Sequence, residues 1–407
     1  MITIIILIIL STVTINAVLG DNGLIEQAKK TKNIAEGSIE DEKEKLNSLS
    51  QEYANLMAEN EEIEKPKTVA DYKDSGEVFD ETKTICDEKG NEITVPEGFK
   101  IASDSGDTVQ QGIVIEDVNA STDTAVQGSQ FVWIPVGKFI KDNGEESNEI
   151  ILGRYTFAKD DQGTPTLEQA AYTEENPENY KNSKVINLYY DEYSGEHRDG
   201  VASFGDGLNA TANDLGEWID SVKTNGGYYI GRYEASYASG SSVENYKAAT
   251  KVSTGYRTYS DGSMLYTEGT LWNWITQLEA SKVAINTYKE SRSVKSDLMN
   301  SYAWDTAIVY IQECGNTNYA NQDGYSINNN LTNTGTGQDE VCKINDMTSN
   351  IREWTTEYSS YTRGSDARPC TSRGGNYALS GYCAAHRGDD SATGSYDNVG
   401  FRLSLYM

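Results

Sequence analysis

The sequence is poor in histidine, and only His197 and His386 occur among its 407 residues. Two imidazoles cannot form a three-histidine site, which excludes most catalytic zinc and non-haem iron centres. The five cysteines are widely spaced and include no C-x-x-C pair, which excludes a zinc ribbon. No G-x-x-x-x-G-K-[ST] or G-x-G-x-x-G motif occurs, so we expect no nucleotide cofactor.

Basic residues are also scarce, because 34 Lys and Arg stand against 63 Asp and Glu, for a formal net charge of −29. A chain this acidic is repelled by phosphate backbones, so we expect no nucleic-acid partner. About half of the charge lies between residues 40 and 123, which contain 23 acidic and 8 basic residues. The net charge therefore says little about a ligand-binding surface elsewhere in the chain.

The first apolar run covers residues 2–19 and is interrupted only by small or polar residues. A helix of this length spans roughly 27 Å, just enough to cross a bilayer core. No stripe of the run is polar enough to face water, which disfavours a buried core helix. No Lys or Arg precedes Lys29, so the basic region of a secretory signal is missing. We expect a single N-terminal membrane anchor, and the cysteines and acidity favour an extracytoplasmic C-terminal domain.

Composition divides the chain into three parts. Residues 1–58 are predicted to form an anchor and a helical stalk, 59–83 an acidic linker without periodicity, and 84–407 a folded domain. The domain mixes strands and helices without βαβ regularity, which predicts an α+β fold. We expect a hairpin turn at 87–91, strands at 130–136 and 227–233, a loop-rich insertion at about 142–208, and helices at 212–224, 272–288 and 301–313.

The N-terminal segment ITIIILIILSTVTINAVLGDNGLIEQAKKTKN resembles the first helix of type IV prepilin-like proteins from Gram-positive bacteria. In those proteins an apolar helix is followed by G-[DE]-N-G-[IL] and a charged helix. The resemblance implies a membrane protein with its C-terminal part outside the cell, and a possible pilus-type assembly. The basic leader of that family does not precede the run here, so a simple anchor is the alternative to a filament subunit.

A second resemblance extends over residues 131–407. The segments FVWIPVGKF, GGYYIGRYEASY, SYAWDTAIVYI, INDMTSNIREWTTE, SRGGNY, CAAHR and NVGFRLSL occur in that order. Together they resemble the formylglycine-generating, sulfatase-modifying family. The resemblance implies a divergent C-type-lectin-like fold.

The catalytic residues of that family do not carry over. Its sulfatase-activating enzymes bind copper through two cysteines between R-G-G-S and the C-A-A-R strand, and here residues 377–382 fill that interval without a cysteine. Cys383 matches a different, structural cysteine of the family. The iron-dependent sulfoxide synthases of this fold need a histidine triad that the chain lacks. We therefore expect no copper, no iron and no catalytic residue. A sulfatase-modifying-type oxidoreductase with an unrecognised centre is the alternative.

Calcium is the cofactor that the sequence suggests, at D-M-T-S-N-I-R-E in residues 346–353. Carboxylates seven positions apart, with carbonyls between them, can wrap one hard cation if the segment curls. In the resembled family this motif supplies a calcium site, which implies ligands at Asp346, Ser349, Ile351 and Glu353. Ser349 stands where the family usually has Gly. The alternative is that Asn350 and Glu353 are buried hydrogen-bonding residues, with Trp354 in the core.

Arginine replaces lysine after Lys343, which favours fixed and partly buried ion pairs. Arg373 in R-G-G and Arg402 in G-F-R are therefore predicted to be structural clamps. Cys370 and Cys383 flank R-G-G-N-Y and would face each other if their strands form an antiparallel pair.

The interval 376–398 is rich in Tyr, Ser, Gly, Asn and Asp, which is typical of binding loops. In lectin-like domains of this kind, the face near the last G-F-R strand displays the ligand-contacting residues, and some relatives diversify this stretch through retroelements. An ordinary loop without a partner is the alternative. We expect His386 to be a surface histidine in a polar loop, and an acid–base pair with Asp389 and Asp390 is the other interpretation. The candidate ligand-binding residues are Tyr377, Tyr382, His386, Asp389, Tyr396 and Asp397.

These observations predict a membrane-tethered surface protein for adhesion, with a non-catalytic lectin-like domain. Its expected partner is an extracellular protein or glycan, bound through the Tyr-rich C-terminal loops. The oxidoreductase and the minor pilin are the alternatives from other classes.

Overall fold

The computed structural model describes residues 66–171, 186–190, 197–199, 212–257, 266–358, 362–363, 366–368 and 370–407. The predicted anchor and stalk at 1–58 lie outside these ranges. The chain separates into two units, Met1–Pro66 and Lys67–Met407, and the second contains nearly all of the described residues. Within the described ranges, no helix has the length and apolar character needed to cross a bilayer.

The folded unit starts inside the stretch expected to be a linker. A capping box between Thr68 and Asp71 begins helix α3 (Val69–Ser75), which ends at the left-handed Gly76. The helix buries Val69 and Tyr72. Two buried residues are too few to produce a visible period in the sequence, so the helix was not predicted within 59–83.

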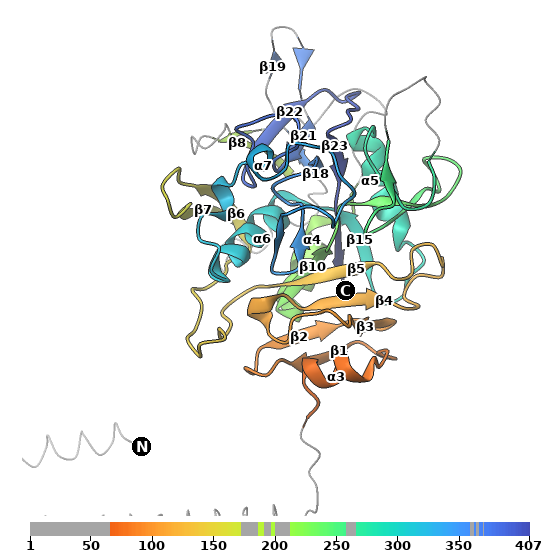
Figure 1. Ribbon diagram of the computed structural model, residues 1–407, viewed down its shortest axis with the longest axis vertical. Helices are drawn as coiled ribbons and strands as arrows, with labels where there is room; N and C mark the ends of the chain where they lie inside the picture. The colour runs from red at the N-terminus through yellow and green to blue at the C-terminus, as the bar shows by residue number, and fades with distance from the viewer. Residues whose placement is uncertain are drawn as a thin grey trace, which may run out of the picture. The chain divides into compact units, whose positions relative to one another are not determined.

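A six-stranded antiparallel sheet forms the middle of the unit (Figure 1). Early strands occupy one edge of this sheet and late strands the other, and β24, the last strand of the chain, lies between β15 and β10. The order is β15 (Lys295–Leu298), β24 (Leu403–Tyr406), β10 (Gly227–Gly231), β5 (Gln130–Pro135), β4 (Val114–Asp117) and β3 (Phe99–Ile101).

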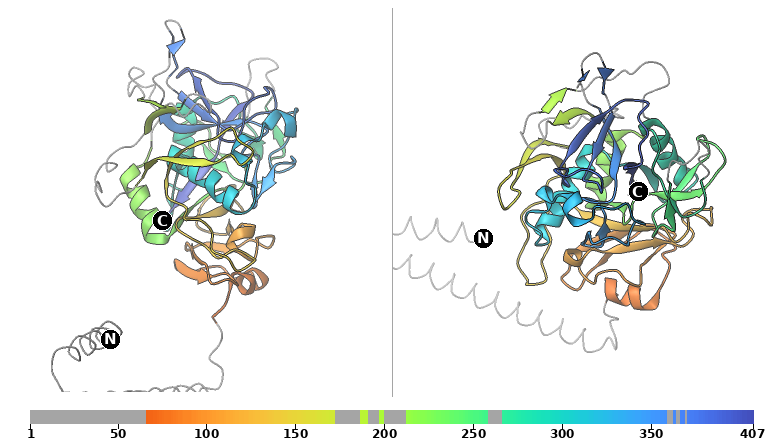
Figure 2. Two further views of the ribbon diagram at one scale, coloured as in Figure 1. Left: turned by 90° about the vertical axis from the view of Figure 1, so that its left-hand side faces the viewer. Right: turned by 45° about the horizontal axis from the view of Figure 1, so that its top comes forward.

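A second, mixed sheet lies at the end of the unit opposite α3, as both views in Figure 2 show. Strand β18 is its centre, with an antiparallel partner in β21 and parallel partners in β8 and β23. The sheet contains β22 (Arg387–Asp390), β21 (Cys370–Arg373), β18 (Arg352–Tyr358), β8 (Ile186–Tyr190), β9 (His197–Asp199) and β23 (Val399–Phe401).

The remaining strands form small sheets at the margins. The β1–β2 hairpin turns at the predicted position, and β6 and β7 form a hairpin within the insertion that was expected to be loop-rich. These sheets are β12 (Lys247–Ala249), β11 (Ser236–Ser239), β14 (Thr270–Leu271) and β13 (Gly255–Tyr256); β1 (Lys83–Cys86) and β2 (Glu92–Val95); β6 (Gly153–Phe157) and β7 (Pro165–Ala170); β16 (Glu340–Val341) and β17 (Ile344–Asn345); β19 (Thr362–Arg363) and β20 (Asp366–Ala367).

Three helices pack on the sheets close to their predicted positions. Helix α4 (Leu215–Asn225) packs on β10, α5 (Gln277–Thr287) on β15, and α6 (Ser301–Glu313) on β5, β6 and β18. Helix α5 starts five residues later than predicted because the Thr276–Glu279 capping box fixes its first turn. The short elements η1 (Val109–Gln111), η2 (Tyr319–Asn321) and α7 (Gly324–Ile327) complete the described helices.

The hydrophobic core is continuous between the sheets and α6. Trp133, Trp304 and Trp354 are among its largest side chains, and each is at most 1% exposed. Strands and helices alternate without βαβ units, so the predicted α+β class is confirmed. The strands 130–136 and 227–233 and the helix 301–313 also occur as predicted, to within two residues at each end.

Candidate binding site

The hairpin of β21 and β22 fixes the residues around R-G-G. Its register pairs Arg373 with Arg387 and Cys370 with Asp390. Cys370 and Cys383 therefore do not face each other, and the prediction that they do is wrong. The two strands are antiparallel as expected, but the loop between them starts after Arg373, so Cys383 lies in the loop and Cys370 at the far end of the hairpin.

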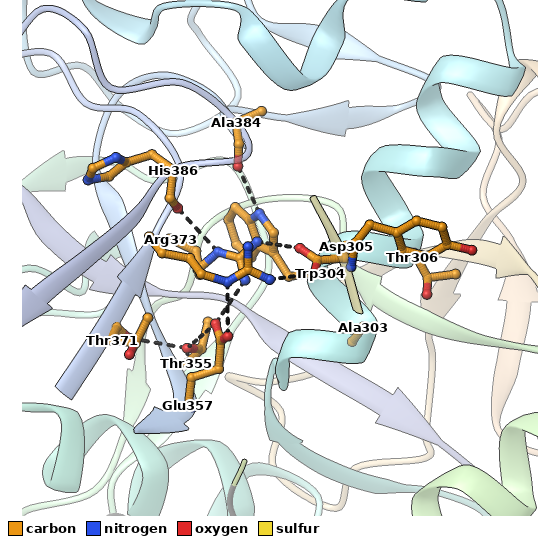
Figure 3. Close-up of polar contacts among 12 residues, drawn as sticks. Ala303, Trp304, Asp305, Thr306, Thr355, Glu357, Thr371, Arg373, Ala384 and His386 are labelled. Atoms are coloured by element: carbon orange, nitrogen blue, oxygen red, sulfur yellow. Dashed lines mark hydrogen bonds and ion pairs between the residues drawn. The ribbon is translucent and has the colours of Figure 1, made fainter. Parts of the chain in front are cut away.

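Two buried acids accept hydrogen bonds from the guanidinium groups of both Arg373 and Arg387. Arg373 Nη1 donates to Glu357 Oε2 at 2.8 Å, and Arg387 Nε donates to Glu357 Oε1 at 3.1 Å. Asp305 accepts from both arginines through its two carboxylate oxygens. Figure 3 shows this bridge, with the Arg373 guanidinium near the ring of Trp304. We call these four residues, Asp305, Glu357, Arg373 and Arg387, the Arg373 cluster.

The Arg373 cluster leaves no capacity for a ligand. The side chains of Arg373, Asp305 and Glu357 are fully buried. The remaining Nε of Arg373 donates to the His386 carbonyl at 3.2 Å, and the backbone N–H of Tyr155 donates to Asp305 at 2.9 Å. Saturated hydrogen bonds and ion pairing are what buried charges require, so this arrangement is structural.

The two glycines of R-G-G are required by close packing. A Cβ atom on Gly375 would lie 2.0 Å from the Thr348 carbonyl oxygen, and one on Gly374 would lie 2.6 Å from that of Met347. Gly374 also has a positive φ of 83°. The motif therefore brings β21 against the 346–353 segment, where a side chain would not fit.

A second buried cluster forms where the chain crosses from the mixed sheet to the central sheet. Arg402 lies between β23 and β24 and donates to Glu353 Oε1 through Nη2 at 2.6 Å. Its other donors reach the carbonyls of Gly231 at 2.8 Å and Asn345 at 2.7 Å. Arg402 is fully buried, so it holds the last strand to β10 and β18 at once.

The acids next to Arg402 are held by hydrogen bonds from the chain itself. Glu234 accepts from Asn350 Nδ2 at 2.6 Å and from the Ile351 N–H at 3.1 Å. Asp346 accepts from the Gly335 N–H at 2.8 Å. Burial raises the pKa of Glu353 to about 7 and raises that of Glu234 well above its ordinary value. We call Glu234, Asp346, Asn350, Glu353 and Arg402 the Arg402 cluster.

The 346–353 segment does not present a cation site in this conformation. Glu353 faces Arg402 with both carboxylate oxygens, and within the described ranges no group of three His, Cys, Asp or Glu is arranged to hold a metal. The positive φ angles fall on Asp346 and Asn350, at 61° and 58°, and not on Ser349. Asn350, Glu353 and Trp354 are buried, which is the arrangement of the hydrogen-bonding alternative. The calcium site stays a prediction that these contacts do not favour.

His386 is buried and not a surface residue, contrary to the expectation. It is 4% exposed, and its ring lies edge-on to Tyr382, with ring centroids 4.2 Å apart. Burial lowers its pKa well below the ordinary value, and the nearby charges of Arg352, Arg373 and Arg387 lower it further. Figure 3 shows that its carbonyl, and not its ring, faces Arg373. Most of the C-A-A-H-R segment is buried. The polar residues that follow His386 in the sequence suggested a surface loop instead.

The next three candidates, Tyr382, Asp389 and Tyr396, lie beside charged side chains. Tyr382 is half-buried and lies over the Arg352 guanidinium, 5.6 Å from ring centroid to Cζ. Asp389 lies 3.9 Å from Arg368, and burial raises its pKa to about 6. Tyr396 is half-buried beside Asp390, which raises its pKa further than burial alone. These residues form a partly covered polar layer and not an open pocket.

Tyr377 and Asp397 lie on the surface and contact each other. The Tyr377 hydroxyl donates to Asp397 Oδ2 at 3.0 Å. Burial, with the Asp397 carboxylate, raises the pKa of Tyr377 to about 12. Exposed apolar surface flanks this pair, because Tyr256 is 40% and Leu379 44% exposed. The structure therefore separates the Tyr377–Asp397 pair from the other four candidates, of which His386 is buried and packs on Tyr382.

A polar pocket of about 590 Å³ lies at the edge of the predicted binding interval. Only Gly381 comes from that interval, and its N–H donates to Asp323 Oδ2 at 2.9 Å. Asn321 Nδ2 donates to the Ala158 carbonyl at 2.8 Å, which joins η2 to the β6–β7 turn. The lining residues are Lys159, Asp160, Asp161, Asn318, Asn321, Asp323 and Gly381.

The sequence did not single out the pocket residues, because they come from three separate segments. Lys159, Asp160 and Asp161 form the turn of the β6–β7 hairpin, in the insertion that looked featureless. Asn318 directly precedes η2, Asn321 is its last residue, and Asp323 precedes α7. Their shared signal is a local excess of Asp and Asn, which is also what ordinary turns contain.

Comparisons with known proteins show only distant likeness. No protein-family model and no curated protein matches the chain. Among solved structures, the chain is similar to CarF at a TM-score of 0.29 and 13% identity, over 55% of this chain and 97% of that one. It is similar to Treponema denticola variable protein 1 at a TM-score of 0.31 and 14% identity, over 56% of this chain and 94% of that one. It is similar to PvdO from Pseudomonas aeruginosa at a TM-score of 0.32 and 11% identity, over 69% of this chain and 95% of that one. At such TM-scores, nothing about function follows from these likenesses.

Proposed function

We propose that this chain is a membrane-tethered surface protein whose folded unit is a non-catalytic binding domain of the C-type-lectin-like kind. The sequence motifs of residues 131–407 support the lectin-like fold, and the apolar run at 2–19 supports the anchor. The proposed ligand is an extracellular glycan. The polar pocket beside Gly381 is the observation that carries this proposal.

The chemistry of the pocket suits a polyhydroxylated ligand. Its exposed side chains include those of Lys159, Asp160 and Asp161, and carboxylates that accept hydrogen bonds next to a lysine that donates them are complementary to adjacent sugar hydroxyls. Its volume of about 590 Å³ falls within the range of small-molecule sites. The Tyr325 ring, 40% exposed and two residues from Asp323, offers an apolar face close to the pocket wall.

The buried clusters support a binding role over a catalytic one. The arginines and acids of R-G-G and G-F-R are occupied by one another. They fix the hairpin β21–β22 and the loops that it carries. Rigid strands that support polar loops are the usual architecture of a binding face.

The test is a glycan array probed with the full-length chain in mild detergent, followed by calorimetry with any glycan that binds. The variant Asp161→Ala removes an exposed pocket carboxylate, and Asp220→Ala removes an exposed carboxylate on α4 as the matched control. We expect affinity to fall at least tenfold with Asp161→Ala and to stay unchanged with Asp220→Ala. Equal affinity in both variants, or no glycan bound at all, would contradict the proposal.

A further inference from the structure

Two of the five cysteines meet at a site that the sequence did not suggest. Cys314 ends helix α6, where its N–H donates to the Tyr310 carbonyl at 3.0 Å. Its own carbonyl accepts from Gln110 Nε2 at 3.4 Å. The C-terminal end of α6 is therefore fixed against η1.

Cys342 reaches the same place from the tight turn between β16 and β17. It has a positive φ of 48°, and Lys343 after it has 64°. Gly112, the residue that follows η1, packs so closely on Cys342 that a Cβ atom there would lie 2.1 Å from the Cys342 carbonyl oxygen. Both cysteines thus contact one short segment, residues 110–112, and both pack against the hydrophobic core.

Tyr310 lies between the two cysteine segments. Its hydroxyl donates to the Val109 carbonyl at 2.6 Å, and the N–H of Gly112, which packs on Cys342, donates to the same carbonyl at 3.2 Å. Burial raises the pKa of Tyr310 well above its ordinary value, and Cys314 and Cys342 beside it contribute to the rise. Burial likewise raises the pKa of Cys314, with the hydrogen-bonded neighbour Cys342 as the next cause. The other cysteines lie elsewhere: Cys86 in β1, Cys370 in β21 and Cys383 in the following loop.

We propose that Cys314 and Cys342 form a disulfide bond when the folded unit is in an oxidising compartment. The bond would close a loop, with 27 residues between the two cysteines, from the end of α6 to the β16–β17 turn. That loop contains η2, α7 and the pocket residues Asn318, Asn321 and Asp323. Because a cross-link restricts the unfolded loop, it would stabilise the wall of the pocket.

The reaction is thiol–disulfide exchange with a small-molecule disulfide as the oxidant. A Cys342 thiolate attacks one oxidant sulfur, forms a mixed disulfide and releases the first oxidant thiolate. Cys314, after losing its proton, then attacks the Cys342 sulfur and releases the second thiolate. Two electrons pass from the cysteines to the oxidant, and both thiol protons are released. Cys314 is mostly protonated at neutral pH because burial raises its pKa, so we expect faster closure in alkaline buffer.

The test uses the full-length chain, equilibrated with oxidised and reduced glutathione, alkylated without reduction, digested and examined by mass spectrometry. We expect a cross-linked peptide that contains Cys314 and Cys342, with Cys86, Cys370 and Cys383 alkylated. Full alkylation of Cys314 and Cys342 in the oxidised sample would overturn the proposal. So would a bridge that joins either of them to a different cysteine.

A thermal measurement separates this bond from a non-specific effect of oxidation. We expect the melting temperature of the oxidised chain to exceed that of the reduced chain by about 2 °C or more. This difference should disappear in Cys342→Ser and remain in Cys86→Ser, which removes the exposed cysteine of β1 as a control. Cys342→Ser can also lower the melting temperature of the reduced chain. The comparison therefore uses, within each variant, the melting temperature of the oxidised form minus that of the reduced form. The same difference in both variants would overturn the proposal.

Discussion

The Arg402 cluster and the polar pocket contain the same kinds of side chain and behave in opposite ways. In the cluster, carboxylates and a guanidinium are buried and hydrogen-bonded to one another or to backbone. In the pocket, Asp161 is exposed and Lys159, Asn321 and Asp323 face an open space. The recognisable sequence motif belongs to the cluster, and the space for a ligand belongs to the pocket. The motif residues thus lie among buried ion pairs, and the proposed binding site lies where loops without a recognisable motif converge.

Desolvation explains the difference between the two regions. A charge that leaves water must find partners within the protein, so the cluster fixes the charged groups that it contains. An exposed carboxylate keeps its water shell, and its oxygens remain able to accept hydrogen bonds from a ligand that replaces part of that water. Substitutions in the cluster should therefore change stability, whereas substitutions in the pocket should change affinity.

The largest effect is expected from Arg402→Met. The change leaves Glu353 buried beside Glu234 and Asp346 without its cation. We expect the free energy of unfolding to fall by about 3–5 kcal/mol. Urea denaturation followed by circular dichroism measures it.

The matched control for that variant is Lys295→Met, which breaks an ion pair with Glu217 whose side chains are 55% and 57% exposed. An exposed pair contributes about 0–1 kcal/mol. If both variants lost the same stability, the contrast between buried and exposed charge would not hold.

The next effect concerns pH and the buried carboxyl of Asp297. Burial raises its pKa from 3.8 to about 7, although the Asn213 and Leu298 N–H groups donate to it. Between these two values the folded chain binds more protons than the unfolded chain. Stability from this group is therefore greatest below pH 4, declines as the pH rises to 7, and is constant above that.

Asp297→Asn should flatten this part of the pH profile. We expect the drop in unfolding free energy between pH 4 and pH 8 to shrink by on the order of 2–4 kcal/mol. Denaturant titrations at several pH values measure it, with Asp220→Asn as the exposed control. An unchanged slope in Asp297→Asn would mean that its carboxyl keeps its ordinary pKa.

A smaller effect is expected from Gly375→Ala in R-G-G. The added methyl group would meet the carbonyl oxygens of Thr348 at 2.0 Å and Tyr382 at 2.6 Å. We expect a loss of about 1–3 kcal/mol, measured by thermal unfolding. Gly255→Ala on β13, where a Cβ atom meets nothing within 4 Å, should be close to neutral. A neutral Gly375→Ala would show that the motif is not required by packing.

The smallest effect is expected from Tyr377→Phe, which removes the exposed hydrogen bond to Asp397. We expect stability to change by less than about 1 kcal/mol. Glycan affinity should change much less than it does in Asp161→Ala, because Tyr377 does not line the pocket. Calorimetry decides between the two regions: a larger loss of affinity in Tyr377→Phe would move the binding site to the Tyr377–Asp397 pair.

Strand and helix periodicity predicted the local elements well and their partners poorly. The helix at 301–313 and the strand at 130–136 were predicted from apolar and aromatic spacing, which depends only on neighbours in sequence. The same spacing could not show that β10 lies between β24 and β5. The small helix α3 was missed because two buried residues leave no repeat to detect.

The candidate residues show the same limit at the level of side chains. The prediction that Arg373 and Arg402 are structural agrees with their burial and ion pairs. Asp305 and Glu357, the ion-pair partners of Arg373, were not singled out, although Asp305 is an isolated acid within the apolar stretch SYAWDTAIVYI and could have been noticed. His386 was predicted to be a surface residue because its neighbours in the sequence are polar. The packing of its ring against Tyr382 depends on how the loop folds, which the sequence does not show.

The sequence by itself determined the acidic composition, the scarcity of histidine and the mixed class of the fold, since these depend on residue counts and local periodicity. Tertiary structure alone decided that Cys314 meets Cys342, that His386 is buried, and that Asp161 and Asp323 share a pocket. Each of these depends on contacts between residues that are distant in the chain or on a register between strands. Such contacts are selected by packing and desolvation over the whole domain, and no window of sequence contains them.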